Sequence, residues 1–147
     1  MFDFFVPTKL LFGPGKLSEL HSQELPGKKA MVVISDGKSA RASGALDRTV
    51  SELKKAGADC AVFDKVMANP LRSTVMDGAA FARENGCDFI VALGGGSVMD
   101  AAKAMAAMAT NDGDIWDYMC GGTGGAKTLK NKPLPVVCIT TTAGTGS

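Results

Sequence analysis

Short runs of apolar residues recur along the chain, and longer segments with a helical pattern separate them. Each run has four to six residues with no charged position inside it. Continuous runs of this length are typical of parallel strands that are buried on both faces of a sheet. The pattern therefore predicts strands at residues 30–34, 60–63, 89–93 and 134–139.

Helical periodicity fills the segments between these runs, at residues 42–56, 73–85 and 97–109. In the first segment, Leu46 and Val50 recur at a spacing of four, which places them on one face of a helix. The third segment is almost entirely alanine and methionine, so we expect a helix that is buried on nearly all sides. Strands that alternate with helices indicate an α/β domain with a Rossmann-like, largely parallel sheet flanked by helices.

The first fifteen residues do not follow this alternation. Apolar residues at 4–6 precede Pro7, and a second apolar group at 9–12 precedes a Gly-Pro-Gly turn. This pattern predicts a short N-terminal strand pair before the α/β units. Early edge strands are free to pair with another chain, so a homodimer is one expected use of them.

Composition sets limits on the function. The chain has 147 residues, of which 46% are hydrophobic and 21% charged, and its formal net charge is +1. These values suit one globular domain, exclude disorder as the dominant state, and argue against a nucleic-acid partner. We expect no membrane association and no signal peptide, because no run approaches about 20 apolar residues and the N-terminus lacks a basic region. The four cysteines are widely spaced, which favours reduced thiols and a cytoplasmic location.

The strongest chemical signal follows the third predicted strand, where Gly94, Gly95, Gly96 and Ser97 lead directly into a helix. Glycines let a phosphate approach the backbone, and the N–H groups and dipole of a helix start favour an anion. Ser97 is expected to cap the helix, with Asp100 completing a capping box. The turn matches neither a Walker A loop nor a GxGxxG fingerprint. A tight turn that binds no ligand is the alternative.

Two further segments follow predicted strands. Asp36 comes after the first, where a carboxylate can accept hydrogen bonds from an adenosine ribose and repel a 2′-phosphate, which favours NAD over NADP. The alternative is a turn aspartate that caps the next helix. The threonine- and glycine-rich segment 140–147 follows the fourth strand, and its hydroxyl and N–H groups suit phosphate or ribose contacts. The alternative is a flexible tail.

Together these segments resemble the iron-containing (group III) alcohol dehydrogenases. The resemblance covers the whole chain in the family's order, in the segments 7–15, 35–37, 69–70, 94–103, 113–118 and 141–147. It implies an N-terminal nucleotide-binding domain, with the diphosphate of NAD on the glycine turn and the ribose on Asp36. It also implies cofactor contacts from Asn69, from Asp100, and from Thr141, Thr142 and Thr145. One departure is Thr140, where many relatives carry proline.

The resemblance further implies a metal, Fe2+ or Zn2+, held by one aspartate and three histidines on a helical C-terminal domain. This sequence has one histidine, His21, and lacks that domain, so residues 1–147 are expected to form the dinucleotide-binding domain alone and to be inactive without the rest. The expected substrate of the complete enzyme is a small alcohol or aldehyde. Three alternatives remain: a glycerol dehydrogenase-like relative, a dehydroquinate synthase-like relative, or a stand-alone nucleotide-binding module.

Overall fold

The structure is a computed structural model, and it describes residues 1–3, 5 and 7–142. The strands are β1 (Lys29–Ser35), β2 (Asp59–Val66), β3 (Phe89–Gly94) and β4 (Val136–Thr140). The helices are the 3-10 helix η1 (Lys16–Ser22), α1 (Ser39–Ala42), α2 (Ala45–Lys55), α3 (Arg72–Glu84), α4 (Gly96–Thr110) and α5 (Ile115–Tyr118). Each apolar run between residues 30 and 139 contributes to a strand, and the three helical patterns correspond to α2, α3 and α4.

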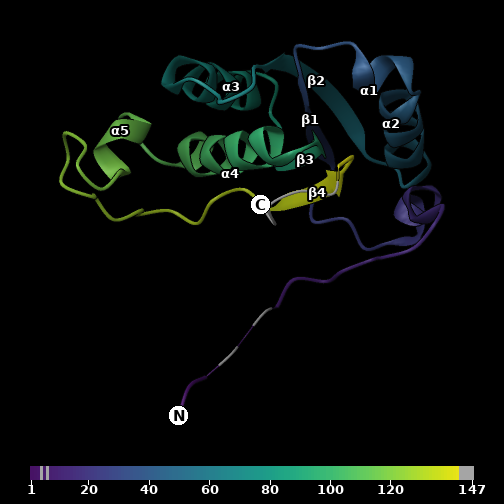
Figure 1. Cartoon of the computed structure of the whole chain (residues 1–147), viewed down its shortest axis with the longest axis horizontal. Helices are drawn as coiled ribbons and strands as arrows, with labels where there is room; N and C mark the ends of the chain where they lie inside the picture. The colour runs from purple at the N-terminus through teal and green to yellow at the C-terminus, as the bar shows by residue number, and fades with distance from the viewer. Residues whose placement is uncertain (4, 6, 143–147) are drawn as a thin grey trace.

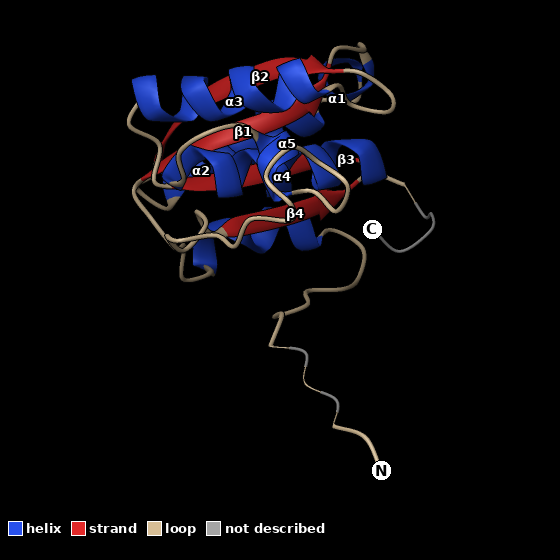
Figure 2. Ribbon diagram, turned by 90° about the vertical axis from the view of Figure 1, so that its left-hand side faces the viewer, coloured by secondary structure: helices blue, strands red, loops and turns tan. Residues whose placement is uncertain are grey.

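The strands of the described residues form one sheet in the order β2-β1-β3-β4, and all neighbouring pairs run parallel (Figures 1 and 2). In the pairing of β1 with β3, Val33 lies opposite Ala92. The chain steps from β1 to β2 in one direction and then crosses back to β3 and β4 on the other side of β1. The order of the sheet therefore reverses between β1 and β3, which confirms the expected Rossmann-like α/β architecture.

Helices cover both faces of the sheet. Met31 of β1 packs into a core cluster with residues of α3 and α4, whereas its neighbour Val32 packs into a second cluster with residues of α2 and η1. Alternate side chains of a strand point to opposite faces, so β1 contributes to both clusters. A Cβ atom on Gly78 of α3 would lie 2.5 Å from Met105 Sδ of α4, so this glycine lets the two helices pack closely.

The two strands on one side of the reversal differ in burial. Every residue of β3 is buried. Its helix α4 buries seven of its fifteen residues and exposes Asp100 and Lys103, so it is less buried than the alanine- and methionine-rich sequence predicts. The fourth strand was predicted to be buried on both faces, and this is wrong: β4 lies at the edge of the sheet, and Cys138 is exposed. An apolar run does not reveal the order of strands, so an edge strand resembles a central one.

The predicted N-terminal strand pair is not found where the structure describes the chain. Residues 9–12 form no strand, and 4–6 cannot be compared because Phe4 and Val6 lie outside the described residues. The segment leads away from the body of the protein (Figure 2), and Leu10 and Phe12 are 80% and 89% exposed. A strand needs a neighbour for its backbone hydrogen bonds, and this segment has no neighbouring strand within the described chain.

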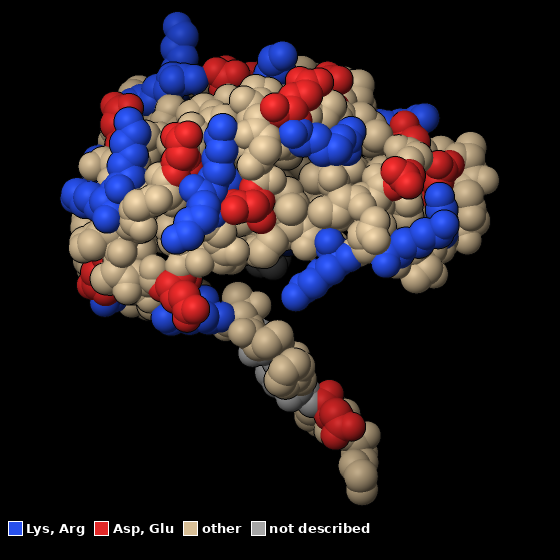
Figure 3. Space-filling model, turned by 180° about the vertical axis from the view of Figure 1, so that it is seen from behind, with Lys and Arg blue, Asp and Glu red and all other residues tan. Residues whose placement is uncertain are grey.

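The surface carries charges of both signs. On the face shown in Figure 3, Lys and Arg side chains alternate with Asp and Glu over the body of the protein, while the N-terminal segment is mostly uncharged. This mixture agrees with the formal net charge of +1. None of the helices in the described part of the chain is long and apolar enough to cross a membrane.

Candidate nucleotide-binding site

The turn between β3 and α4 is built by close packing around two glycines. A Cβ atom on Gly94 would lie 2.7 Å from Val98 Cγ2, and a Cβ atom on Gly95 would lie 3.1 Å from Thr142 Oγ1. Gly95 has φ −88° and ψ −169°, which any residue can adopt, so its backbone conformation does not require glycine. The missing side chain at Gly95 instead keeps the space above the turn open and lets the segment after β4 approach.

Helix α4 begins at this turn, and its first N–H groups bond to no carbonyl of the described residues. The Gly95 carbonyl accepts the first bonds of the helix, from the N–H groups of Val98 and Met99, both at 3.1 Å. The first N–H groups of a helix have no partner inside it, and with the helix dipole they attract an anion. Since α4 has fifteen residues, its dipole is fully developed. No side chain occupies the cap position, so the helix start stays accessible to a ligand.

The predicted capping box is wrong. The N-cap residue is Gly95 and the helix begins at Gly96, so Ser97 already lies inside the first turn. Three consecutive glycines allow the helix to begin before the serine, and the serine side chain is left for another contact. Asp100 is exposed and forms an ion pair with Lys103 at 3.3 Å rather than reaching back to the turn.

Ser97 connects the glycine turn to the loop between β2 and α3. Its Oγ accepts the backbone N–H of Asn69 at 3.4 Å, so Asn69 lies beside the turn. The cofactor contact that the resemblance implies for Asn69 stays a prediction. Asn69 has φ 56°, a left-handed conformation that asparagine tolerates better than most residues. The sequence contained no signal for this contact, because the two residues are 28 positions apart.

The threonine segment also lies against the turn. Gly94 pairs with Thr140 in the sheet, and the Thr141 N–H donates to the Gly94 carbonyl at 3.1 Å. The Thr140 hydroxyl donates to the Thr142 carbonyl at 2.8 Å, which shapes the end of β4. Thr141 and Thr142 are therefore next to the helix start. The cofactor contacts that the resemblance implies for them stay a prediction. Thr145 lies outside the described residues.

Asp36 stands at the end of β1, on the other side of the sheet reversal. Its N–H donates to the Val66 carbonyl at 3.0 Å, and its side chain is exposed. The carboxylate makes no hydrogen bond or ion pair with any part of the chain that the structure describes. The alternative interpretation, a cap for the next helix, is not supported, because the N-cap of α1 is Lys38 and has no side-chain hydrogen bond.

These residues meet where ligands bind in open parallel sheets. Asp36 and Gly95 each lie three residues beyond the paired Val33 and Ala92, so both occupy the carboxyl ends of the two strands between which the strand order reverses. The crevice outside such a reversal is the usual ligand site of this architecture. The helix start fits a diphosphate, the carboxylate fits a ribose diol, and Gly95 places no side chain over the turn. The residues present therefore fit a dinucleotide.

They do not fit the family's metal. Within residues 1–3, 5 and 7–142, no group of three or more His, Cys, Asp or Glu side chains is placed to hold an ion. The single histidine, His21, lies on η1 and binds the carboxylate of Glu52 on α2 through Nδ1. Hydrogen bonds from Lys55 and His21 lower the pKa of Glu52 to about 2, and the bond between His21 and Glu52 joins η1 to α2.

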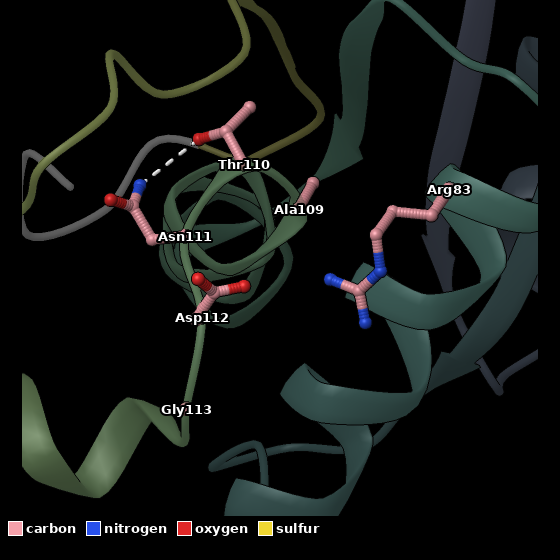
Figure 4. A pocket seen from close by; sticks show the side chains of 6 residues that line it. All are labelled: Arg83, Ala109, Thr110, Asn111, Asp112 and Gly113. Carbon is pink, nitrogen blue, oxygen red and sulfur yellow. Dashed lines mark hydrogen bonds between the residues drawn. The ribbon is translucent and has the colours of Figure 1, made fainter.

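A separate hollow of about 430 Å³ lies at the opposite end of α4, between Arg83 and residues 109–113 (Figure 4). The fifteen residues of α4 span roughly 20 Å, so this hollow is far from the glycine turn. The Arg83 guanidinium of α3 donates to the Met108 carbonyl near the end of α4 at 2.7 Å, and this bond links the two helices. The hollow is not part of the candidate site.

The fold and the strand-end turn thus define a Rossmann-like α/β domain. The family model for iron-containing alcohol dehydrogenases matches residues 7–147, and the chain belongs to this family. It is 42% identical to 1,3-propanediol dehydrogenase of Klebsiella pneumoniae and 34% identical to NAD-dependent methanol dehydrogenase of Bacillus methanolicus. Both alignments cover 100% of this chain and 37% of the relative, so the chain spans little more than a third of their length.

Solved structures agree. NADH-dependent butanol dehydrogenase A from Thermotoga maritima matches 99% of this chain with a TM-score of 0.88 and 33% identity, and the match covers 36% of that protein. A 1,3-propanediol oxidoreductase matches 99% of this chain with a TM-score of 0.85 and 42% identity, over 37% of its own length. The architecture of the described residues is therefore that of the corresponding part of these dehydrogenases.

Proposed function

We propose that this chain binds NAD at the carboxyl end of its sheet and positions the nicotinamide for hydride transfer with a small alcohol or aldehyde. The observation that carries the proposal is the meeting of three segments at the strand reversal: Asp36, the turn 94–97 and Thr141–Thr142. The names of the relatives, which include NAD-dependent and NADH-dependent alcohol dehydrogenases, support the same cofactor.

In this proposal each segment has its own part. The N–H groups at the start of α4 bind the diphosphate, and the Asp36 carboxylate accepts hydrogen bonds from both hydroxyls of the adenosine ribose. Asn69 borders the adenosine side, while Thr141 and Thr142 line the path towards the nicotinamide, with Asp100 nearby. Thr145 is assigned to the same end by the resemblance alone. When bound, NAD supplies the ring that accepts or returns the hydride.

The metal of the whole protein is proposed to lie outside residues 1–147, on the helical domain that the resemblance implies. The resemblance implies three histidine ligands, and residues 1–147 contain one histidine. We therefore expect the chain by itself to bind nucleotide without oxidising an alcohol. The free state of all four cysteines supports the proposed cytoplasmic location.

Isothermal titration of the chain with NAD and with NADP tests the cofactor assignment. We expect NAD to bind more tightly, and we expect Asp36→Gly to reduce this preference by about tenfold, because it removes a charged acceptor and a repulsive charge together. A protein that binds neither nucleotide, or a variant with an unchanged NAD/NADP ratio, would contradict the assignment.

A second variant tests the diphosphate position. Gly96→Val places a branched side chain at the first residue of α4, where the proposed diphosphate sits, and is expected to abolish NAD binding. Circular dichroism and urea unfolding establish whether the variant is folded. A folded Gly96→Val protein with the affinity of the wild type would place the diphosphate elsewhere.

A further inference from the structure

Two cations follow Asp36 in the chain, and one of them is held by an acid on the neighbouring strand. Lys38 ends the turn after Asp36, and Arg41 lies on α1, which begins at the next residue, Ser39. Arg41 Nη2 donates to Asp64 Oδ2 of β2 at 2.7 Å. The two side chains are 54% and 48% exposed, so the ion pair lies at the surface.

This ion pair lies on the side of the crevice that carries Asp36. The Asp36 N–H donates to the carbonyl of Val66, two residues beyond Asp64, and Ser35 pairs with Val66 in the sheet. This backbone bond joins the turn after β1 to the carboxyl end of β2, and the Arg41–Asp64 ion pair joins α1 to β2. Arg41 is five residues beyond Asp36, on the helix that follows the same turn, so we infer that it can reach the ribose that the proposed function places on Asp36.

The chemistry of that place distinguishes two classes of nucleotide. A ribose with a free 2′-hydroxyl donates to a carboxylate, whereas a 2′-phosphate is repelled by it and needs a nearby cation, for which arginine is best suited because its guanidinium binds phosphate through two parallel bonds. When an arginine is bound to a carboxylate, the negative charge of the partner offsets the charge of the guanidinium, and the guanidinium points towards that partner.

We propose that Asp64 is a second determinant of nucleotide choice, which acts by keeping Arg41 from the ribose 2′ position. The inference rests on the proposed function and extends it: Asp36 excludes the 2′-phosphate directly, and Asp64 excludes it by engaging the cation that would bind it. Without Asp64, Arg41 becomes the ligand for a 2′-phosphorylated nucleotide. Asp64 is thus a positioning residue and makes no contact with the nucleotide.

The role of the Arg41–Asp64 ion pair can be tested by replacing its residues. An exposed pair of this kind contributes little to folding stability, so its removal should leave the protein folded. Asp47 of α2 provides the matched control, because it lines the same surface hollow as Arg41 and its replacement by asparagine changes the charge equally.

The experiment is calorimetric titration of the full chain with 5′-AMP and with 2′,5′-ADP, which differ only in the 2′-phosphate. Asp64→Asn is expected to raise the affinity for 2′,5′-ADP relative to 5′-AMP by about fivefold or more, the size of a charge-assisted contact. Asp47→Asn should change the ratio by less than about twofold, as expected for a screened charge. Asp64→Asn combined with Arg41→Gln should return the ratio to the wild-type value, and Asp36→Asn combined with Asp64→Asn should give the largest preference for 2′,5′-ADP.

Four results would overturn the inference. Equal ratios for Asp64→Asn and Asp47→Asn would leave only a general effect of charge. A gain that survives Arg41→Gln but is lost with Lys38→Gln would assign the phosphate to Lys38. A wild-type chain that binds neither nucleotide would remove the proposed function as well, whereas normal 5′-AMP binding with a ratio unaffected by Asp64→Asn would reject the role of Asp64 alone.

Discussion

The two ends of the parallel strands carry the same residue types in different roles. The amino edge is the side of the sheet where the strands begin, and the carboxyl edge is the side where they end. Asp88 lies immediately before β3, at the amino edge, and its carboxylate accepts the backbone N–H groups of Lys28 and Lys29 at 2.8–3.0 Å. Asp36 lies immediately after β1, at the carboxyl edge, and its carboxylate accepts no hydrogen bond from the described residues. One aspartate joins two segments of the fold, and the other is left available to a ligand.

The glycines near these aspartates follow the same division. A Cβ atom on Gly27 would lie 2.3 Å from Asp88 Oδ1 and 2.8 Å from Phe89 Cδ1, so this glycine makes room for the protein's own carboxylate. Among the described residues, a Cβ atom on Gly95 would meet only the Thr142 side chain, at 3.1 Å. A change at the amino edge should therefore alter stability, and a change at the carboxyl edge should alter binding.

The largest expected effect is at the amino edge, in Gly27→Ala. The added methyl group displaces the Asp88 carboxylate from its two N–H donors, so we expect a loss of about 2–3 kcal/mol of unfolding free energy from overpacking and broken hydrogen bonds. Urea unfolding measures it. NAD affinity, extrapolated to the folded fraction, should be that of the wild type. A variant as stable as the wild type would mean that the Asp88 contacts contribute nothing.

Gly95→Val is the counterpart at the carboxyl edge. We expect NAD affinity to fall by about tenfold or more, because the branched side chain fills the space above the helix start, while stability changes by less than about 1 kcal/mol since the backbone conformation is open to any residue. Titration with NAD and urea unfolding give the two values. If binding survives and stability falls, Gly95 belongs with Gly27 as a packing residue.

The sequence predicted the division only in part. Apolar runs showed the strands, and the residues after three of these runs gave the candidate site, because strand ends in a parallel sheet lie together. The contact of Ser97 with Asn69 depends on how two distant loops pack, and no local pattern encodes it. The capping rule failed at Ser97 because three glycines leave the start of the helix to tertiary packing. The edge position of β4 and the pairing of His21 with Glu52 were hidden for the same reason.

A smaller expected effect is the pH dependence of the stability that Asp88 contributes at the amino edge. Partial burial raises the pKa of Asp88, but the N–H groups of Lys28 and Lys29 outweigh this and lower it below its ordinary value of 3.8. A lowered pKa in the folded state means that the contribution to stability is complete above the pKa of the unfolded chain and is lost as the pH falls through the folded value. Wild type should therefore lose its advantage over Asp88→Asn as the pH falls below about 4.

The measurement is urea unfolding of both proteins from pH 7 to pH 2.5. At pH 7 we expect Asp88→Asn to be less stable by about 1 kcal/mol, since an amide oxygen replaces a carboxylate that accepts several N–H groups. Glu52, whose pKa is about 2, is present in both proteins and cancels in the difference. A difference that stays constant with pH would show that the charge of Asp88 is not the source.

The smallest expected effect concerns Asp100, an acid on the first turns of α4. Its ion pair with Lys103 is 3.3 Å long and more than half exposed, so Asp100→Asn should change stability by less than about 0.5 kcal/mol. The sign of its effect on NAD affinity is informative. If the carboxylate accepts a hydrogen bond from the cofactor, affinity should fall by about twofold to threefold, whereas a carboxylate that only faces the diphosphate should repel it, and affinity should rise.

We expect the affinity of Asp100→Asn for NAD to fall, and calorimetric titration with NAD at two ionic strengths measures this change. A lost hydrogen bond should give nearly the same decrease at both, because a direct contact is screened little, while relief of repulsion would be larger at low salt. Asp77→Asn provides the control, since Asp77 is an exposed acid on α3 and carries no predicted contact with the cofactor. A salt-dependent rise in affinity for Asp100→Asn alone would show that the Asp100 carboxylate repels the diphosphate and accepts no hydrogen bond from NAD, which would contradict its assignment as a binding residue.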